Sequence, residues 1–308
     1  MPASRLSLSR TPSPEPQAEL ERGPEPESDT EPETDPESES ESESEPSEPP
    51  YTPDELAEIL LDFYIFLTTL HYDIADLKMP PSGGWPNITP ESVGDIKSDY
   101  AIEVLRCLPY FNSEEHIHQA SKLIDYSLFS REDFQTGYFR DREAGEGLEF
   151  YSHDGEETEL VDILCIASGR ESGGRQFFLD VIHGELSEDI IRATQLSQMD
   201  IKTFLNQLKE EYRSLKLIPC VGRVTIDAWT FKERETEITE EEVRAQTEDG
   251  TTELDAQYFR QVLRQYGWPD EFRRDDAKRA IDEICNSMAG ERDAWGAIPA
   301  YWEGPWEP

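Results

Sequence analysis

The chain has 308 residues, of which 68 are acidic and 28 are basic, so its formal net charge at neutral pH is −40. A surface this negative repels phosphate groups, which argues against nucleic-acid binding and against docking on an anionic membrane. Hydrophobic residues make up 36% of the chain, and no apolar run approaches the roughly 18 residues that a membrane-spanning helix requires.

The first 50 residues differ in composition from the rest of the chain. They hold 11 of the 22 prolines, no aromatic residue, and 15 acidic against 3 basic side chains. Ordering a backbone costs about 1 to 2 kcal/mol per residue, and few apolar side chains are available here to offset that cost. We therefore expect residues 1–50 to form a disordered acidic arm rich in proline, serine and glutamate.

Two parts of this arm have the composition of kinase substrates. Thr11 and Ser13 are each followed by proline, whereas a second group of serines alternates with glutamate, namely Ser38, Ser40, Ser42 and Ser44. An extended Ser/Thr-Pro backbone fits a kinase cleft, and flanking carboxylates suit a kinase with a basic substrate groove. These six residues are candidate phosphorylation sites. The alternative is an arm that only keeps the folded part soluble.

Two helix starts follow the arm. Thr52-Pro53 with Glu55 has the pattern of a capping box with proline in the first turn, and it predicts a helix that runs to about Leu70. Thr89-Pro90-Glu91 repeats this signal and predicts a second helix that runs to about Pro109. Both segments carry apolar residues at i, i+3 and i+4 spacing, which is typical of helices with a buried face.

Strands are predicted after a long charged segment. Gly137–Glu159 contains four glycines and little periodicity, which predicts a surface loop with a short edge strand at Leu148–Tyr151. Val161–Ala167 and Gln176–Ile182 are apolar and rich in β-branched or aromatic residues, and turn-forming residues lie between them. We expect these two segments to pair as antiparallel strands.

The remaining elements complete an α+β domain with an antiparallel sheet flanked by helices. Ser197, three residues before Asp200, predicts the start of a helix whose apolar stripe ends at Leu215. A further strand is predicted at Arg223–Phe231, and three helices at Thr239–Ala245, Glu253–Tyr266 and about Arg274–Met288. We assign residues 51–222 to this domain and expect residues 223–308 to pack on it.

Motifs for phosphate and metal binding are weak. Gly169–Gly174 follows a strand but lacks the spacing of a phosphate-binding loop, which favours a hairpin turn. His116 and His118 can present two imidazoles on an extended segment, but no other histidine lies at metal-ligand spacing. The four cysteines are too far apart for a zinc cluster or a disulfide framework. We therefore expect a cytoplasmic or nuclear protein with no metal or other cofactor.

Acidic residues near the strand pair leave an enzyme as the alternative. A nuclease that uses metal ions would need Asp162, Glu171 or Asp180 close to a lysine, and no lysine occurs between Lys122 and Lys202. Arginine cannot replace lysine as a tunable proton carrier, so a nuclease is disfavoured. A hydrolase with acidic catalytic residues near the strand pair remains as the alternative function.

The last 14 residues are rich in aromatic side chains, namely Trp295, Tyr301, Trp302 and Trp306. Prolines and glycines between them prevent a regular helix. Because indoles bury large areas, we expect this tail to dock on the chain's own surface; the alternative is a segment that binds a partner. Trp85 and Trp268 each lie in a Gly-Trp-Pro sequence, which we interpret as two loop anchors.

One arrangement of residues resembles a known family. An apolar run at Ile163–Ala167 precedes Gly173-Gly174, a second run ends at Leu179-Asp180, and a helix carrying Phe204-Leu205 follows Gly184. This order resembles the SUKH superfamily, which includes fungal cell-wall-synthesis regulators and bacterial toxin-immunity proteins. The likeness covers about residues 90–215. The family's usual Leu-Pro at the entry of the early helix is replaced here by Leu108-Pro109 at its end.

The whole chain also resembles a family of proteins from filamentous fungi with no assigned activity. These resemblances imply an α+β interaction module without a catalytic site, flanked by disordered arms that bind signalling partners. Together with the charge, they predict a non-enzymatic protein-interaction module, such as a signalling or cell-wall-regulatory scaffold. Its expected partner is a protein with a basic surface, because opposite charges speed and orient association.

Overall fold

The computed structural model describes residues 48–112, 116–118, 121–135, 149–169, 174–190, 198–219, 225–248 and 251–288. Contacts along the chain separate residues 1–46 from residues 47–308, and all described residues belong to the second unit. All six candidate phosphorylation sites and the four tail aromatics Trp295, Tyr301, Trp302 and Trp306 lie outside the described residues. Their predicted roles therefore stay predictions.

The first predicted helix is confirmed as α1 (Pro53–Leu70). Its start is the predicted capping box, in which the Glu55 carboxylate accepts from the Thr52 amide at 2.8 Å and the Thr52 hydroxyl accepts from the Glu55 amide at 3.3 Å. The apolar stripe along α1, which includes Leu56, Leu60, Phe63 and Leu67, is fully buried. Local sequence signals are sufficient here because cap and stripe agree.

The second predicted helix, from Thr89 to about Pro109, is wrong as a single element. The chain forms α2 (Pro90–Val93), a 3₁₀ turn η2 (Gly94–Ile96) and then α3 (Asp99–Cys107). Gly94 breaks the helix with φ of +69°, a conformation that glycine adopts without strain. Ser98 then starts α3, since its hydroxyl accepts from the Ala101 amide at 3.1 Å.

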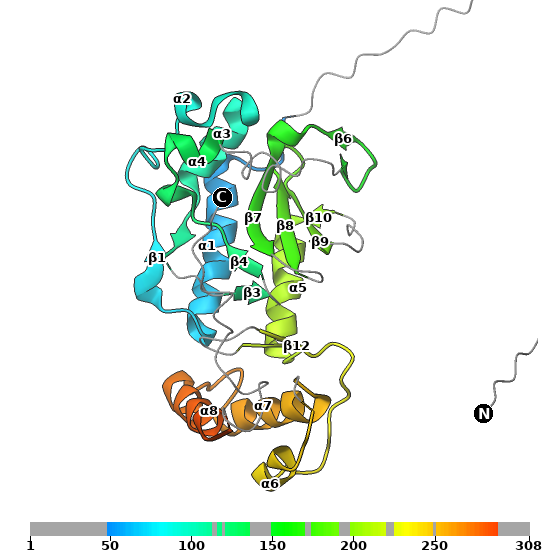
Figure 1. The fold of residues 1–308 in the computed structure, drawn as a ribbon. Coiled ribbons are helices and arrows are strands. Elements are labelled where there is room, and N and C mark those ends of the chain that lie inside the picture. Colours follow the sequence, from blue (N-terminus) through cyan, green and yellow to red (C-terminus); the bar gives the residue numbers. More distant parts are fainter. Residues whose placement is uncertain are drawn as a thin grey trace, which may run out of the picture. The chain divides into compact units, whose positions relative to one another are not determined.

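The centre of the fold is a six-stranded antiparallel sheet with the order β10-β9-β8-β7-β4-β3 (Figure 1). Its strands are β3 (His116–His118), β4 (Ser121–Leu123), β7 (Ile163–Gly169), β8 (Arg175–Asp180), β9 (Glu185–Ile190) and β10 (Met199–Asp200). The predicted pair is confirmed as β7 and β8, with Leu164 opposite Leu179. With helices beside this sheet, the predicted α+β class is confirmed.

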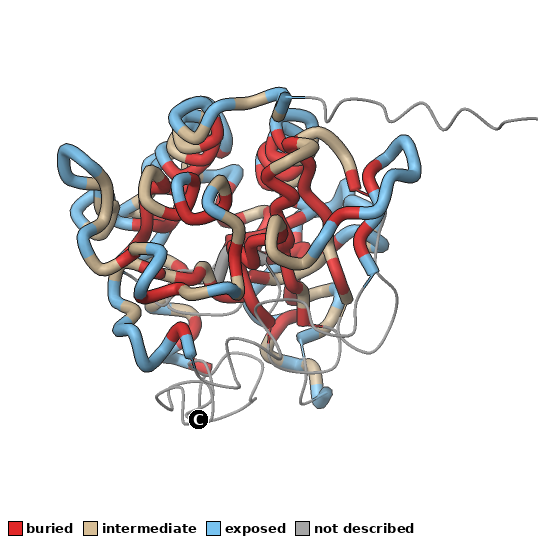
Figure 2. Tube along the Cα trace, turned by 90° about the horizontal axis from the view of Figure 1, so that it is seen from above, coloured by how far each residue is buried: buried red, intermediate tan, exposed pale blue. Residues whose placement is uncertain are grey.

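Successive residues of β8 face opposite sides of the sheet, and this alternation sets its two layers. Phe177 contacts Phe204 of α5 (Ile201–Arg213) in an edge-to-face arrangement with ring centroids 5.6 Å apart. Phe178 instead contacts Phe150 of β5 (Phe150–Tyr151) at 5.1 Å. Helix α5 therefore packs on one face of β8, and the hairpin that contains β5 packs on the other. Figure 2 shows the buried positions gathered in the interior of the folded unit and the exposed positions around its periphery.

Helix α5 starts differently from the prediction. Its N-cap is Asp200, whose carboxylate accepts from the Thr203 amide at 2.9 Å, whereas Ser197 lies outside the described residues. The predicted strand at Arg223–Phe231 is reduced to β12 (Ile226–Asp227), which pairs with β11 (Leu217–Ile218) outside the central sheet. Several short elements were not predicted. They include β1 (Leu77–Lys78), β2 (Tyr110–Phe111), α4 (Arg131–Gln135) and the 3₁₀ turns η1 (Ile74–Asp76), η3 (Tyr126–Leu128) and η5 (Leu160–Asp162).

The last three helices are confirmed as α6 (Glu240–Arg244), α7 (Glu253–Gln265) and α8 (Arg274–Met288). They lie beyond the C-terminal ends of α1 and α5 (Figure 1). Donors from this part satisfy carbonyls at those ends: Arg274 donates to Thr68 at 2.9 Å, and the Trp268 indole donates to Arg213 at 2.9 Å. Free carbonyls and a negative dipole end make helix C-termini good acceptors for such donors.

Both predicted loop anchors use their indole in the same way. The Trp85 indole donates to the Leu108 carbonyl at 2.8 Å, as the Trp268 indole does to the Arg213 carbonyl.

Across the described part of the chain, no helix has both the length and the apolar character needed to cross a bilayer.

Candidate functional site

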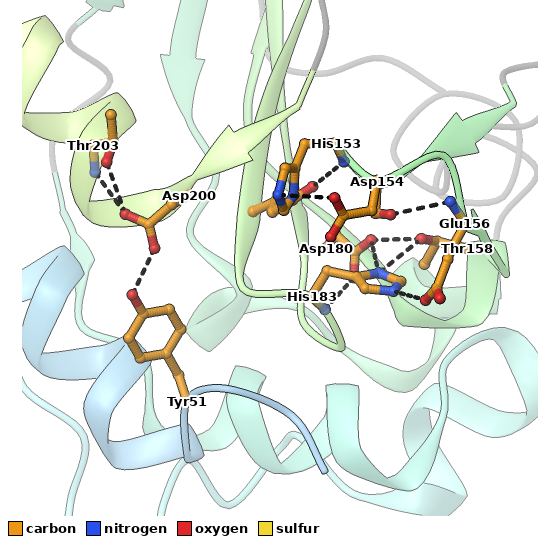
Figure 3. Close-up of polar contacts among 11 residues, drawn as sticks. Tyr51, His153, Asp154, Glu156, Thr158, Asp180, His183, Asp200 and Thr203 are labelled. Atoms are coloured by element: carbon orange, nitrogen blue, oxygen red, sulfur yellow. Dashed lines mark hydrogen bonds and ion pairs between the residues drawn. The ribbon is translucent and has the colours of Figure 1, made fainter. Parts of the chain in front are cut away.

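The residues with the most unusual polar environment lie where two short segments meet (Figure 3). The first is the hairpin formed by β5 and β6 (Glu157–Thr158), called the acidic hairpin here and spanning residues 149–159. The second is the turn between β8 and β9, residues 180–185. Each segment contributes one histidine and carboxylates to the contact.

Two buried carboxylates form the floor of this contact. Asp180 ends β8 and Glu185 begins β9, and the two residues are direct partners in the antiparallel register. Asp180 is 0% exposed and Glu185 is 3% exposed. Directly opposed like charges destabilise a sheet, and burial makes an uncompensated charge more costly still. Among the described residues, neither carboxylate has an ion pair with lysine or arginine, so the two histidines supply the positive charge.

His153, at the tip of the acidic hairpin, holds Glu185. Its backbone amide donates to one Glu185 oxygen at 3.1 Å, and its ring Nδ1 contacts the other oxygen. Its ring Nε2 lies 3.4 Å from the Asp154 carboxylate. The bond to Glu185, together with the charges of Glu185 and Asp154, raises the pKa of His153 above its usual value.

His183, in the turn, makes the reciprocal contact. Its Nδ1 lies 2.8 Å from Asp180, and its Nε2 lies 3.4 Å from Glu156 of the hairpin. Burial opposes protonation of His183, but the bond to Asp180 and the charges of Asp180, Glu156 and Glu185 outweigh it, so its pKa is raised. Thr158 adds a hydroxyl that donates to Asp180 at 2.6 Å.

The opposite face of the acidic hairpin is exposed and carries a different set of side chains. Phe150, Ser152 and Thr158 point inward, whereas the outer face consists of Glu149, Tyr151, Glu157 and Glu159. Tyr151 is 46% exposed, stands opposite Glu157 in the register, and donates to Glu149 at 3.3 Å. The charges of Glu149 and Glu157 raise the pKa of the Tyr151 hydroxyl, which reports the negative potential of this face.

Within the part of the chain that the structure describes, this outer face carries no cation. Residues 149–169 contain no lysine or arginine. Among the described residues, Glu149, Glu157 and Glu159 take part in no ion pair. An exposed aromatic ring framed by unpaired carboxylates matches a lysine or arginine side chain, since the ring face attracts a cation and the carboxylates neutralise it.

The other side of the turn is held by Tyr51, which precedes α1 (Figure 3). Its hydroxyl donates to Asp200 at 2.6 Å, a bond that is the main reason why the pKa of Tyr51 is raised to about 12. Its carbonyl accepts from the Tyr100 hydroxyl, and the ammonium of Lys202 lies 4.6 Å from the centre of its ring. The turn is therefore enclosed by the hairpin on one side and by the start of the folded unit on the other.

Of the three acids named for a nuclease, the two that the structure describes are engaged in separate contacts. Asp162 accepts from Ser98 at 2.5 Å, Asp180 belongs to the contact above, and Glu171 lies outside the described residues. A lysine does come close to Asp162, namely Lys97 from a distant segment, but its ammonium is buried and donates to the carbonyls of Leu160 and Ile163. Burial lowers the pKa of Lys97 to about 8, and we interpret its role as structural.

The described residues give little support for a metal site or for a ligand pocket at the acidic hairpin and the turn. There, no group of three or more His, Cys, Asp and Glu side chains is arranged to hold a metal ion. His116 and His118 lie on β3, where the structure describes only their backbone. Cys165 is buried, as expected of a core residue, and burial raises the pKa of the Cys107 thiol. Surface grooves of about 590 and 450 Å³ are lined by residues outside the hairpin and the turn.

Sequence reasoning missed most of this site. Only the strand near Leu148–Tyr151 was predicted, and its partner β6 was assigned to a loop. The available signal was the period of two in Glu149–Ser152 and Glu157–Glu159, where polar and buried residues alternate.

Comparisons of the chain with protein-family models, curated proteins and solved structures find no match. The SUKH resemblance therefore stays a prediction.

Proposed function

We propose that the protein is a non-enzymatic interaction module that holds a lysine- or arginine-bearing segment of a partner on the outer face of the acidic hairpin. The observation that carries this proposal is Tyr151, exposed between Glu149 and Glu157 with no cation nearby on its own strand pair. The inner histidines and carboxylates bond to one another, which leaves the outer face as the part of this site open to a ligand.

Binding is expected to depend on both the ring and the charges of this face. We expect Glu149→Gln with Glu157→Gln to weaken binding of a fluorescent Arg/Lys-rich peptide by about tenfold, and Tyr151→Ser by about threefold, given cation–π energies near 0.5–1 kcal/mol at exposed sites. Fluorescence anisotropy with the full chain measures both effects. Affinity should also fall steeply between 50 and 300 mM salt, since exposed charges are screened.

A charge-matched variant separates this face from the general acidity of the chain. Glu235 and Glu237 are exposed and, among the described residues, take part in no ion pair. Glu235→Gln with Glu237→Gln removes the same charge and is expected to change the affinity less than twofold. Equal losses for the two double variants would contradict a defined site and would reduce the binding to bulk charge.

The hydrolase alternative has one observation in its favour, the pairing of a buried carboxylate with an imidazole in Asp180 and His183. In catalysis the imidazole Nε2 would exchange a proton with the nucleophile. Here Nε2 faces the Glu156 carboxylate instead of a hydroxyl or thiol. We therefore favour the interaction module.

A further inference from the structure

In the contact between the acidic hairpin and the β8–β9 turn, both histidines can donate to all their carboxylate partners only when their rings are protonated. Each imidazole lies between two carboxylates, one buried at Nδ1 and one exposed at Nε2. His153 bridges Glu185 and Asp154, and His183 bridges Asp180 and Glu156. Neutral imidazole has one N–H, so it can donate to one of its two carboxylates and must present a lone pair to the other.

Loss of the proton therefore affects both ends of each bridge. At Nδ1 the bond to Glu185 or Asp180 loses its charge assistance. At Nε2 the attraction to Asp154 or Glu156 turns into repulsion between a lone pair and a carboxylate. The directly opposed pair of Asp180 and Glu185 also loses its only cationic neighbours among the described residues.

We propose that the acidic hairpin is fastened to the β8–β9 turn by a proton-dependent latch, formed by His153 and His183, that loosens as these imidazoles become neutral. The reciprocal arrangement supports this proposal, because each segment supplies one histidine to the other's carboxylate. The groups that face the two rings are Glu185, Asp154, Asp180 and Glu156, together with the neighbouring histidine.

The direction of the effect follows from the raised pKa of both histidines. A group whose pKa is higher in the latched state than in the open state, where it is about 6.5, favours the latched state most below that value. This contribution disappears as the pH rises through the raised pKa. The hairpin is thus firmly held in mild acid and freer in mild alkali. If the proposed function is correct, the latch also controls how rigidly Tyr151 is presented to a partner.

Hydrogen–deuterium exchange of the free, full-length chain tests the latch without any partner. Protection factors for amides in residues 149–159, corrected for intrinsic exchange rates, are expected to fall by about tenfold between pH 6 and pH 8, because both imidazoles lose their proton as the pH rises through their raised pKa. A variant with His153→Gln and His183→Gln should show low and pH-independent protection there. Amides of the β7–β8 pair serve as the internal reference for global unfolding.

A milder variant keeps both histidines and both buried carboxylates. Asp154→Asn with Glu156→Gln replaces the exposed Nε2 partners, whose side chains are 76% and 72% exposed. It is expected to move the loss of protection to lower pH. Glu157→Gln with Glu159→Gln removes the same charge from the outer face and should keep the wild-type midpoint. Wild-type protection that does not vary with pH, or an unchanged midpoint in the first variant, would overturn the latch.

The latch and the proposed function can fail separately. Exchange of the free chain reports on the latch alone, and peptide binding at a fixed pH of 6 reports on the outer face alone. Peptide binding weakened about threefold in Tyr151→Ser and about tenfold in Glu149→Gln with Glu157→Gln, together with pH-independent exchange, would support the interaction module and reject the latch. The reverse pair of results would support the latch and reject the module.

Discussion

Replacing Arg260 by leucine is expected to lower the free energy of unfolding by about 3 kcal/mol or more, because each hydrogen bond to a charged group contributes about 1.5–3 kcal/mol. Arg260 of α7 is 3% exposed. Its guanidinium donates to three backbone carbonyls, those of Leu215 at 2.9 Å, Ala228 at 2.9 Å and Phe231 at 3.1 Å. Leucine fills part of the space but leaves these buried acceptors without their donor.

The location of these carbonyls explains the size of the effect. Leu215 follows α5 and has φ of +55°, a left-handed conformation that is unfavourable for a side chain with Cβ. Ala228 and Phe231 belong to the segment that leads from β12 towards α6. Arg260 thus joins the C-terminal helices to the end of α5 and also stabilises a strained turn.

Arg264 is the matched control, one turn further along the same helix. It pairs with Glu233 at the surface, where both side chains are about half exposed. Arg264→Leu is expected to cost less than about 1 kcal/mol, as is usual for exposed ion pairs. Urea denaturation followed by far-UV circular dichroism measures both variants. Equal losses in the free energy of unfolding for the two variants would show that Arg260 does not join the C-terminal helices to the end of α5.

The sequence was most informative where a helix begins with its own cap. Thr52 with Glu55, and likewise Thr239 and Thr252 before α6 and α7, form the capping boxes that mark these starts. Such signals depend on residues three positions apart, so no tertiary information is needed. The error in the second helix has a local cause too, since Gly94 interrupts a pattern that the flanking apolar residues continue.

Strand β9 was missed because its composition opposes its structure. Glu185, Glu188 and Asp189 are unusual in a buried strand, and no strand was predicted for this segment. The segment becomes a strand because it pairs with β8 and β10. Such pairing depends on residues far apart in the sequence, so local composition does not reveal it. Glu188 is neutralised in part by Arg175 of β8, whose guanidinium lies 2.9 Å away.

The candidate site was missed for a related reason. His153 and His183 are 30 positions apart in the sequence, and Asp180 and Glu185 become neighbours only when β8 turns into β9. Neither histidine stands at a spacing that indicates a metal or a catalytic group. The charge of the chain predicts a basic partner, but it does not indicate which of many acidic segments presents an exposed aromatic ring between carboxylates. That information comes from the register of the hairpin and from its contacts.

Gly184→Ala is expected to destabilise the folded unit by about 3 kcal/mol through two separate effects. Gly184 has φ of +67°, where an L side chain costs about 1–2 kcal/mol. A Cβ atom added here would also lie only 2.8 Å from Cε2 of the Tyr51 ring and closer still to Cδ2. The ring cannot retreat easily, because its hydroxyl is bonded to Asp200 and its carbonyl to Tyr100.

Gly155, at the tip of the acidic hairpin, separates the two effects. It has φ of +86°, and a Cβ atom added there would meet no atom within 4 Å. Gly155→Ala should therefore show the conformational cost alone, about 1–2 kcal/mol, and the excess in Gly184→Ala measures the collision with Tyr51. Introducing Tyr51→Ala first removes the main obstacle and leaves the Cγ atom of Pro50 at 3.1 Å, so Gly184→Ala should then cost little more than Gly155→Ala. If the whole excess persists without the ring, Tyr51 is not its cause, and the contact with Pro50 or strain within residues 180–185 must explain it.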